Sequence, residues 1–342
     1  EQADVRAARR LLQRSFYRAA VQLLGELPPW GALAGVRPTK LATAALLEGK
    51  TARETDRMLR TEFFVTAPRR QMCVEAAEHT LAAMQELASR DLSVYIGIPF
   101  CPTRCAYCSF VSQSIEKFGG LLEPYLDVLL REIAYTGKKL SQSGWHIRTL
   151  YMGGGTPTTL SSPQMERLLR AIREHFDLSR CLEFTVEGGR PDTLDAEKLA
   201  VIKQGGATRI SINPQTMSDD VLRAIGRRHT AGQTLEAFRL ARAAGFEDIN
   251  MDLIAGLPCD DLASFTDSVR QILELAPTNV TVHTLALKKG AARSWTQAQL
   301  PGRQTVRDML AEAARQLRAA GFLPYYLYRQ KYTTGGFENT GW

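Results

Sequence analysis

The 342-residue sequence lacks the features that mark membrane, nucleic-acid-binding and extracellular proteins. It has no apolar run long enough to span a bilayer, and no basic run interleaved with aromatic residues. It shows no export signal and has six cysteines, so we expect the reducing environment of the cytoplasm. The net charge of +7 is modest, and Lys and Arg are spread along the chain as on solvated helix faces.

Cysteine is sparse, and the cysteines are not arranged as a structural zinc site or a set of disulfides requires. Cys101, Cys105 and Cys108 follow the spacing Cys-x3-Cys-x2-Cys. A structural zinc site takes four ligands in short paired spacings, yet no further Cys or His follows until His146. An odd trio also cannot pair internally as disulfides. Three thiolates suit a [4Fe–4S] cluster, which normally takes four cysteines, so one iron would be left open to bind a substrate.

A predicted strand precedes this cysteine loop. Val94, Ile96 and Ile98 alternate with smaller or polar positions, as in a strand buried in a sheet. Pro99 and Pro102 remove backbone donors and hold the chain extended. The three cysteines are therefore expected in a loop at the C-terminal end of the strand. The other cysteines, Cys73, Cys181 and Cys259, are expected to be buried thiols without a chemical role.

The chain divides into a helical part and an α/β part. Residues 1–90 are predicted to be an N-terminal helical region, 91–328 a barrel, and 329–342 the start of a C-terminal segment. Strands and helices alternate from residue 93, which is typical of a parallel sheet or barrel. Further strands are predicted over 149–152, 182–186, 208–212, 248–254 and 279–285. Six such units fit a partial (βα)6 barrel, with a doubly wound sheet as the alternative.

Polar and glycine residues follow several of these strands, at the end where parallel sheets bind ligands. A glycine run follows the second strand, Glu187 the third and Gln215 the fourth, while Asp252 lies late in the fifth. The run does not match the dinucleotide pattern G-x-G-x-x-G, because Pro157 occupies the approach to the helix. It could be a tight turn, or it could let backbone groups approach a ligand closely. Glu187 and Asp252, taken singly, could equally be a salt-bridge partner and a loop cap.

The cysteine spacing after the run Tyr-Ile-x-Ile-Pro-Phe at 95–100 resembles the radical S-adenosylmethionine (SAM) superfamily. Within it, the chain looks like the oxygen-independent coproporphyrinogen III oxidase group, HemN and its relatives. The runs Gly-Val-Arg-Pro-Thr-Lys at 35–40 and Tyr-Leu-Tyr-Arg-Gln-Lys at 326–331 resemble the HemZ branch. The likeness to HemN covers about 93–290, and the likeness to HemZ covers nearly the whole chain.

The resemblance implies a TIM-like partial barrel, a [4Fe–4S] cluster and SAM. It implies that the three cysteines bind the cluster and, together with Tyr95, form the catalytic machinery. The residues that it assigns to SAM are Tyr95, Gly153, Gly154, Gly155, Thr156, Glu187, Gln215, Arg227 and Asp252. Reductive cleavage of SAM would give a 5′-deoxyadenosyl radical, with a donor such as flavodoxin or ferredoxin supplying the electron.

The implied reaction is the oxidative decarboxylation of two propionates of coproporphyrinogen III to vinyl groups, which gives protoporphyrinogen IX for heme biosynthesis. We expect Arg329 and Gln330 to bind the substrate, with Lys331, Arg209 and Lys288 as further candidates, because the propionates need cationic partners.

The motif also departs from HemN. Gly97 stands where HemN has a histidine, and Ser109-Phe110 follows Cys108 where HemN has Gly-Cys. Relatives with Cys-x-Phe include a heme chaperone and methyltransferases. Two alternatives therefore stand beside the oxidase: a heme-binding chaperone, and a radical SAM enzyme that opens or methylates another tetrapyrrole or heteroaromatic ring.

Overall fold

The computed structural model describes residues 2–287, 295–329 and 333–342. The described chain forms two compact units. We call residues 87–322 and 333–335, where described, the barrel unit, and residues 2–86, 323–329 and 336–342 the helical unit. None of the helices in these ranges combines the length and the apolar character that crossing a membrane requires.

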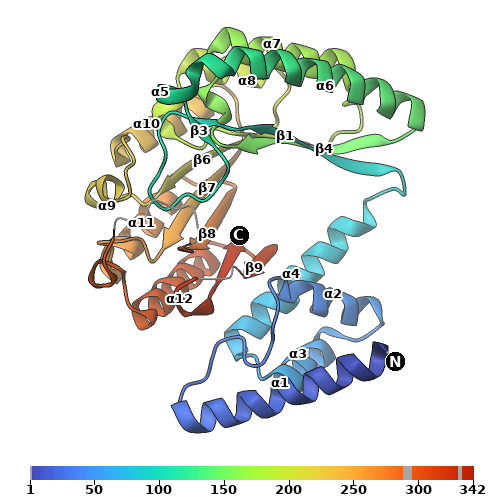
Figure 1. Ribbon diagram of the computed structural model, residues 1–342, viewed down its shortest axis with the longest axis vertical. Helices are drawn as coiled ribbons and strands as arrows, with labels where there is room; N and C mark the ends of the chain where they lie inside the picture. The colour runs from blue at the N-terminus through green and yellow to red at the C-terminus, as the bar shows by residue number, and fades with distance from the viewer. Residues whose placement is uncertain (1, 288–294, 330–332) are drawn as a thin grey trace. The chain divides into compact units, whose positions relative to one another are not determined.

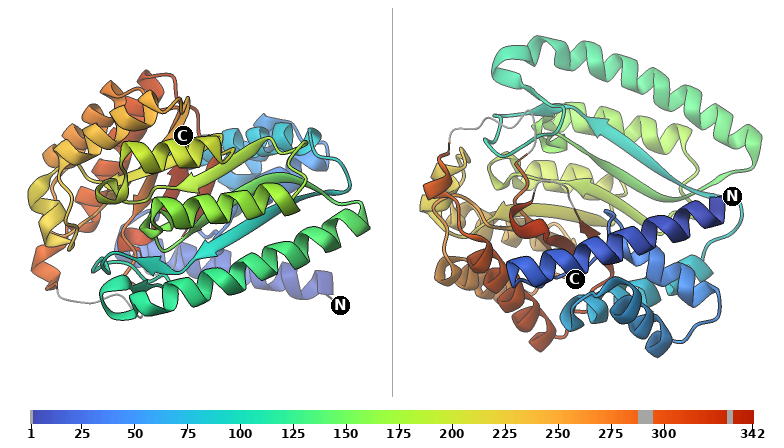
Figure 2. Two further views of the ribbon diagram at one scale, coloured as in Figure 1. Left: turned by 90° about the horizontal axis from the view of Figure 1, so that it is seen from above. Right: turned by 60° about the horizontal axis from the view of Figure 1, so that its bottom comes forward.

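The barrel unit is built on six parallel strands, in agreement with the sequence prediction. In spatial order they are β1 (Asp91–Ile98), β4 (His146–Gly154), β5 (Glu183–Glu187), β6 (Arg209–Gln215), β7 (Asp248–Ala255) and β8 (Asn279–Thr284). The strands curve, and the helices lie on the outer face of the sheet (Figures 1 and 2). The partial barrel is thus confirmed, and the doubly wound alternative, which needs helices on both faces, is wrong.

The helices of the barrel unit follow its strands, as the predicted alternation requires. They are α6 (Leu122–Ser143), α7 (Ser162–His175), α8 (Ala196–Gln204), α9 (Asp219–Ala224), α10 (Ala231–Ala243), α11 (Leu262–Glu274) and α12 (Arg303–Ala319). Shorter elements that the sequence did not predict surround the cysteine loop: β2 (Phe100–Cys101), β3 (Gln113–Ser114) and α5 (Ile115–Phe118). Helix α7 begins with a capping box of Ser161 and Gln164, which stabilises its first turn.

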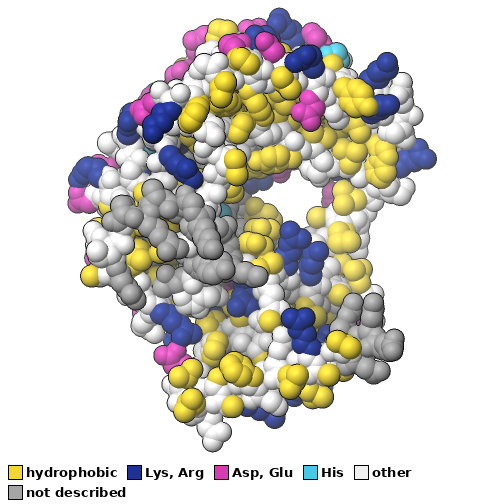
Figure 3. Space-filling view, viewed as in Figure 1, with side chains coloured by type: hydrophobic (Ala, Val, Ile, Leu, Met, Phe, Trp, Pro, Cys, Tyr) yellow, Lys and Arg dark blue, Asp and Glu magenta, His cyan; other side chains and the backbone are white. Residues whose placement is uncertain are grey.

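The basic side chains are distributed over the surface, as their spread along the sequence predicts. On the face in Figure 3, Lys and Arg side chains lie in several separate groups, with Asp and Glu between them. Apolar side chains are also exposed on that face. The exposed apolar residues of α6 include Val128 and Tyr135. One expectation about burial is wrong. Cys259 is exposed, because it lies in the turn before α11 with a left-handed φ of 60°, and Cys181 is only half-buried.

The helical unit combines four helices with a pair of antiparallel strands. The helices are α1 (Gln2–Leu24), α2 (Pro38–Leu47), α3 (Ala52–Phe63) and α4 (Ala67–Gln85); the strands are β9 (Tyr326–Arg329) and β10 (Glu338–Gly341). The sequence assigned 326–328 to the barrel and 329–342 to a separate segment. The two strands instead group with the N-terminal helices, since Arg329 N–H donates to the Val36 carbonyl and the Glu338 side chain pairs with α4.

A buried ion pair holds β10 to α4 within the helical unit. The Glu338 carboxylate accepts from Trp30 Nε1 at 2.7 Å and lies 2.9 Å from Arg69 Nη2, and its side chain is 2% exposed. Breaking a buried pair leaves an uncompensated charge, so we expect Glu338→Gln to lower the free energy of unfolding by about 3 kcal/mol. Guanidinium unfolding of the full chain measures this. Glu48→Gln removes an exposed pair with Lys50 and should change stability by less than about 1 kcal/mol.

Candidate active site

The three cysteines lie on one loop that begins where β1 ends. Phe100 and Cys101 pair with Gln113 and Ser114, which closes the loop on itself. Cys105 is buried, Cys101 and Cys108 are half-buried, and all three thiols are free. The Cys108 N–H donates to the Cys105 carbonyl at 3.1 Å, so the last two cysteines share a tight turn.

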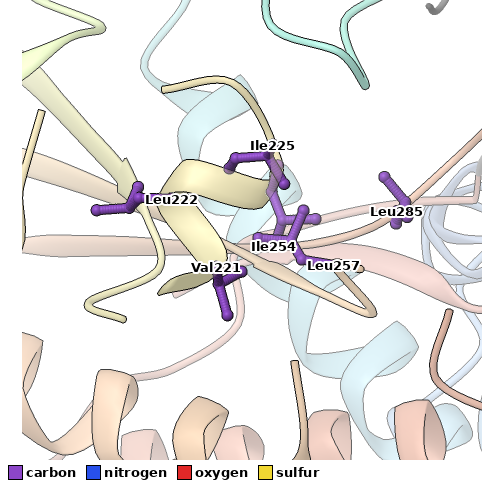
Figure 4. Packing of buried hydrophobic residues seen from close by; sticks show 6 residues of the cluster. All are labelled: Val221, Leu222, Ile225, Ile254, Leu257 and Leu285. Atoms are coloured by element: carbon purple, nitrogen blue, oxygen red, sulfur yellow. The ribbon is translucent and has the colours of Figure 1, made fainter. Parts of the chain in front are cut away.

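A hydrophobic cluster anchors this loop to the rest of the barrel unit. The cluster comprises Val221, Leu222, Ile225, Ile254, Leu257 and Leu285, from α9 and the ends of β7 and β8 (Figure 4). Tyr107, between Cys105 and Cys108, packs against it, and the Ala106 N–H donates to the Ile225 carbonyl at 3.1 Å. The positions of the cysteines are therefore set by packing and backbone bonds.

The thiols influence one another electrostatically, as ligands of one group must. Burial raises the pKa of Cys108, the nearby thiols of Cys105 and Cys101 add to the shift, and Arg227 opposes it. Among the described residues, no group of three His, Cys, Asp or Glu side chains is close enough to hold a single metal ion. A cubane cluster has no such requirement, because each thiolate ligates a different iron. The donor set therefore fits an iron–sulfur cluster better than one ion.

The glycine run lies directly against the cysteine loop. Gly153 and Gly154 pair with Gly97 and Ile98 across β1 and β4, and Gly154 has a φ of 112° that disfavours any side chain. A Cβ at Gly155 would lie 2.4 Å from the Phe100 carbonyl oxygen and 3.0 Å from Cys101 Sγ. Thr156 continues the contact, with its hydroxyl 3.6 Å from Cys101 Sγ. The run thus keeps side chains out of the space beside the thiols.

Glu187 lies at the end of β5, beside the glycine run. It accepts from the Tyr151 hydroxyl at 2.9 Å, and a Cβ at Gly153 would lie 2.8 Å from its Oε2. Burial raises the pKa of Glu187 to about 7, although the hydrogen bond from Tyr151 opposes this. Tyr95 stacks on Tyr151 with ring centroids 5.8 Å apart and is 62% exposed.

Asp252 lies two strands away on the same face of the sheet. Its Oδ2 is 3.4 Å from His283 Nε2, and its Oδ1 accepts from Asn250 Nδ2 at 2.8 Å. Burial alone would raise the pKa of Asp252, but His283 and these hydrogen bonds bring it below its usual value. Asn250 also donates to Ser211, so polar contacts continue towards β6. The two carboxyl groups therefore differ. Glu187 titrates near pH 7, whereas Asp252 is ionised at that pH.

The raised pKa of Glu187 predicts a pH effect on stability. The unfolded carboxyl ionises near 4.5 and the folded one near 7, so the folded state binds more protons between these values and loses stability as pH rises through them. Between about pH 5.5 and about pH 8, we expect the free energy of unfolding to fall by about 1–2 kcal/mol more in the wild type than in Glu187→Gln. Chemical unfolding of the metal-free protein at both pH values measures the difference. Equal slopes would mean that Glu187 ionises normally.

Gln215 lies at the C-terminal end of β6, and Arg227 contacts the cysteine loop. Gln215 has a φ of 73° at a bulge in β6 and is 5% exposed. Arg227 is buried and donates to the Asn213 carbonyl at 2.8 Å and to the Tyr107 hydroxyl at 3.0 Å. The adjacent Arg228 is exposed and pairs with Glu116, so Arg227 is the inward member of this arginine pair.

Of the predicted substrate residues, the structure describes Arg329 and Arg209. Arg329 belongs to the helical unit, where Nη1 donates to the Leu33 carbonyl at 2.7 Å and the guanidinium lies over the Trp30 ring. Arg209 begins β6, at the end of the strand opposite Gln215, and pairs with Glu183 at 3.1 Å. Gln330, Lys331 and Lys288 lie outside the described residues.

Two residues of the site, Tyr151 and His283, were missed by sequence reasoning. Tyr151 was taken as part of an apolar strand, although it stands two residues before Gly153 and so shares its face. His283 is near the end of β8, where the rule that ligands bind at C-terminal strand ends would have selected it.

Known proteins resemble the chain in sequence and in structure. A profile described as the radical SAM superfamily matches residues 95–272, more than half of the chain. HemZ of Bacillus subtilis (strain 168), an oxygen-independent coproporphyrinogen-III oxidase-like protein, is 38% identical over 318 residues, which are 92% of this chain and 64% of HemZ. The heme chaperone HemW of Escherichia coli (strain K12) is 30% identical over 73% of this chain and 64% of HemW.

A solved structure agrees with these matches. Coproporphyrinogen III oxidase (HemN) from Escherichia coli, a radical SAM enzyme, superposes with a TM-score of 0.63 at 30% identity, over 71% of this chain and 56% of HemN. The chain thus spans less than two thirds of the length of each of these relatives. The chain belongs to the radical SAM superfamily, on the HemZ branch of its HemN-like family, and its cofactors are those of the superfamily, a [4Fe–4S] cluster and SAM.

Proposed function

We propose that the chain carries the radical SAM part of an oxygen-independent coproporphyrinogen III dehydrogenase. The observation that carries this proposal is the similarity to HemZ along 92% of the chain. The substrate reaction removes a hydrogen atom from the β-carbon of a propionate. Loss of CO2 and transfer of one electron to an external one-electron acceptor then leave a vinyl group. Two rounds convert coproporphyrinogen III to protoporphyrinogen IX. A reduced flavodoxin or ferredoxin is the electron donor that we propose.

The cysteine loop and the C-terminal ends of the neighbouring strands would bind different cofactors. Cys101, Cys105 and Cys108 would hold the cluster and leave one iron without a protein ligand. When bound together, the cluster and SAM supply a carbon-centred radical that can remove hydrogen from an unactivated carbon. The residues proposed to hold SAM are Tyr95, Gly153, Gly154, Gly155, Thr156, Glu187, Gln215, Arg227 and Asp252.

The chain's own residues would act chiefly by binding and orientation. Ionised Asp252, fixed by His283 and Asn250, suits an ammonium or ribose hydroxyl group. The glycine run offers backbone groups close to the thiols, where a side chain would exclude a ligand. The exposed Tyr95 ring, stacked on Tyr151, offers a flat apolar surface at the open side of the group.

Arg329, a proposed substrate residue, has little freedom in the helical unit. Burial lowers its pKa, and its guanidinium is engaged by the Leu33 carbonyl and the Trp30 ring. It could pair with a propionate only by giving up these contacts. Gln330 follows it and keeps its proposed role as a polar contact to the same substrate.

Anaerobic reconstitution tests the proposal. The protein is loaded with iron and sulfide, given SAM and a strong reductant, and incubated with coproporphyrinogen III. We expect a product lighter by two CO2 and four hydrogens, which is two formic-acid equivalents, with one 5′-deoxyadenosine formed for each vinyl group. If deoxyadenosine forms but coproporphyrinogen is unchanged, the radical chemistry stands and the substrate assignment fails.

A heme-binding chaperone is the second candidate, favoured by the 30% identity to HemW over 73% of the chain. The chain departs from HemN at Ser109-Phe110, directly after Cys108, and resembles the chaperone there. The Phe110 side chain is 67% exposed. This function predicts stoichiometric binding of heme, seen by absorption, and no protoporphyrinogen from the reconstituted protein.

A further inference from the structure

Arg190 holds the first half of the cysteine loop from behind. It follows β5, and its side chain is 3% exposed. Its Nη1 donates to the Thr103 carbonyl at 3.0 Å and to the Thr103 hydroxyl at 2.8 Å. Thr103 lies midway between Cys101 and Cys105, so these two bonds fix the backbone that spaces the two thiols. Neither the sequence motif nor the resemblance assigned Arg190 a role.

Arg227 makes a similar contact with the second half of the loop. Its Nη2 donates to the hydroxyl of Tyr107, which lies between Cys105 and Cys108. Its Nη1 donates to the carbonyl of Gly189, the residue before Arg190, at 3.2 Å. Two buried guanidinium groups thus contact the loop, one between Cys101 and Cys105 and the other between Cys105 and Cys108.

The charges behind the loop do not cancel within this group. Asp192 accepts from Arg190 Nε at 3.3 Å, and its carboxylate also lies 3.9 Å from His229 Nδ1. His229 is buried, and burial together with the Arg227 charge lowers its pKa to about 3, so it is neutral at physiological pH. The two guanidinium groups therefore face one carboxylate, and the group keeps a surplus positive charge in a buried position. Buried charge of this kind is costly unless an opposite charge lies nearby.

We propose that Arg190 is a positioning residue for the iron–sulfur cluster. It holds Cys101 and Cys105 at their spacing before the cluster is assembled, and its charge stabilises the thiolates and the reduced cluster. The thiolates are the anions that the surplus charge lacks, because Arg190 and Arg227 contact the residues that lie between the three cysteines. The inference rests on these cysteines being the cluster ligands, and it does not depend on which tetrapyrrole is the substrate.

Two measurements on the full chain test the two parts of this proposal. In the metal-free protein, trypsin cleavage after the exposed Arg104 reports whether the loop is held, and mass spectrometry identifies the cut. In the reconstituted protein without SAM, a redox titration followed by electron paramagnetic resonance gives the midpoint potential of the cluster. Neither measurement uses catalytic activity.

We compare Arg190→Gln, Arg190→Lys and Thr103→Val with the wild type. Arg190→Gln should be cut about tenfold to a hundredfold faster, since bonds from a charged donor to Thr103 are lost, and its cluster should have a more negative potential. Arg190→Lys should restore the potential, because the charge remains. Thr103→Val should speed the cut at an unchanged potential. The control Arg239→Gln removes an exposed arginine that pairs with Glu236 and should match the wild type in both.

Each part can be overturned separately. Wild-type cleavage in both Arg190→Gln and Thr103→Val would refute the holding role. An unchanged potential in Arg190→Gln, or a potential equally negative in Arg190→Lys, would refute the role of the charge. If Arg190→Gln does not fold, Thr103→Val still decides the holding role, and a potential in Arg190→Lys more negative than that of the wild type still refutes the role of the charge. If the wild type takes up no cluster at these cysteines, the ligand assignment fails, while the cleavage comparison still reports on Arg190.

Discussion

Replacing Cys105 by Ala is expected to abolish the brown absorption of the reconstituted protein, together with nearly all of its bound iron and sulfide. Cys105 is the central ligand of the motif, and it is the buried one of the three. Its loss leaves two half-exposed thiols, which cannot hold three corners of a cubane. The anchoring of Tyr107 does not depend on the thiol, so the variant should fold with the stability of the metal-free wild type.

Cys181→Ala is the matched control, because Cys181 is also a free, partly buried thiol of the barrel unit. It should keep the full iron and sulfide content. A Cys105→Ala protein that retains a complete cluster would show that the ligand assignment is wrong. A wild type that binds zinc without sulfide would remove the basis of radical chemistry in this chain.

The strands and the cysteine loop could be predicted because both depend on local pattern. The alternation of Val94, Ile96 and Ile98 and the prolines at 99 and 102 act within a few residues, so they predict a strand and then a loop. Parallel strands also bring their C-terminal ends together, which is why Glu187 and Asp252 were found. Their different ionisation could not be read in the same way, because it depends on partners from other strands.

The roles of the arginines depend on contacts between distant segments. Arg329 donates to Leu33, 296 positions away in the sequence, and Arg190 donates to Thr103, 87 positions away. No periodicity or spacing encodes such pairs. The distant partner of an arginine cannot be read from its own position in the sequence, which is why the contact of Arg190 with the cysteine loop was missed.

A methyl group at Gly155 is expected to have an effect almost as large as the loss of a cysteine. The added Cβ would meet the Phe100 carbonyl oxygen at 2.4 Å and Cys101 Sγ at 3.0 Å. Neither side can yield easily, since the Gly155 N–H donates to Ile98 at 2.8 Å and the Phe100 side chain is buried against Tyr125. The strain should therefore displace Cys101.

We expect Gly155→Ala to weaken both SAM binding and cluster retention about tenfold to a hundredfold, because overpacking of this kind costs about 1–3 kcal/mol. Equilibrium dialysis with SAM and iron release to a chelator measure the two effects. Gly120→Ala is the control, as no atom lies within 4 Å of its added Cβ. If Gly155→Ala lost SAM binding but kept its cluster, the glycine would serve the approach of SAM alone. If it kept both at wild-type strength, the contact between the glycine run and the cysteine loop would have no part in assembling the site.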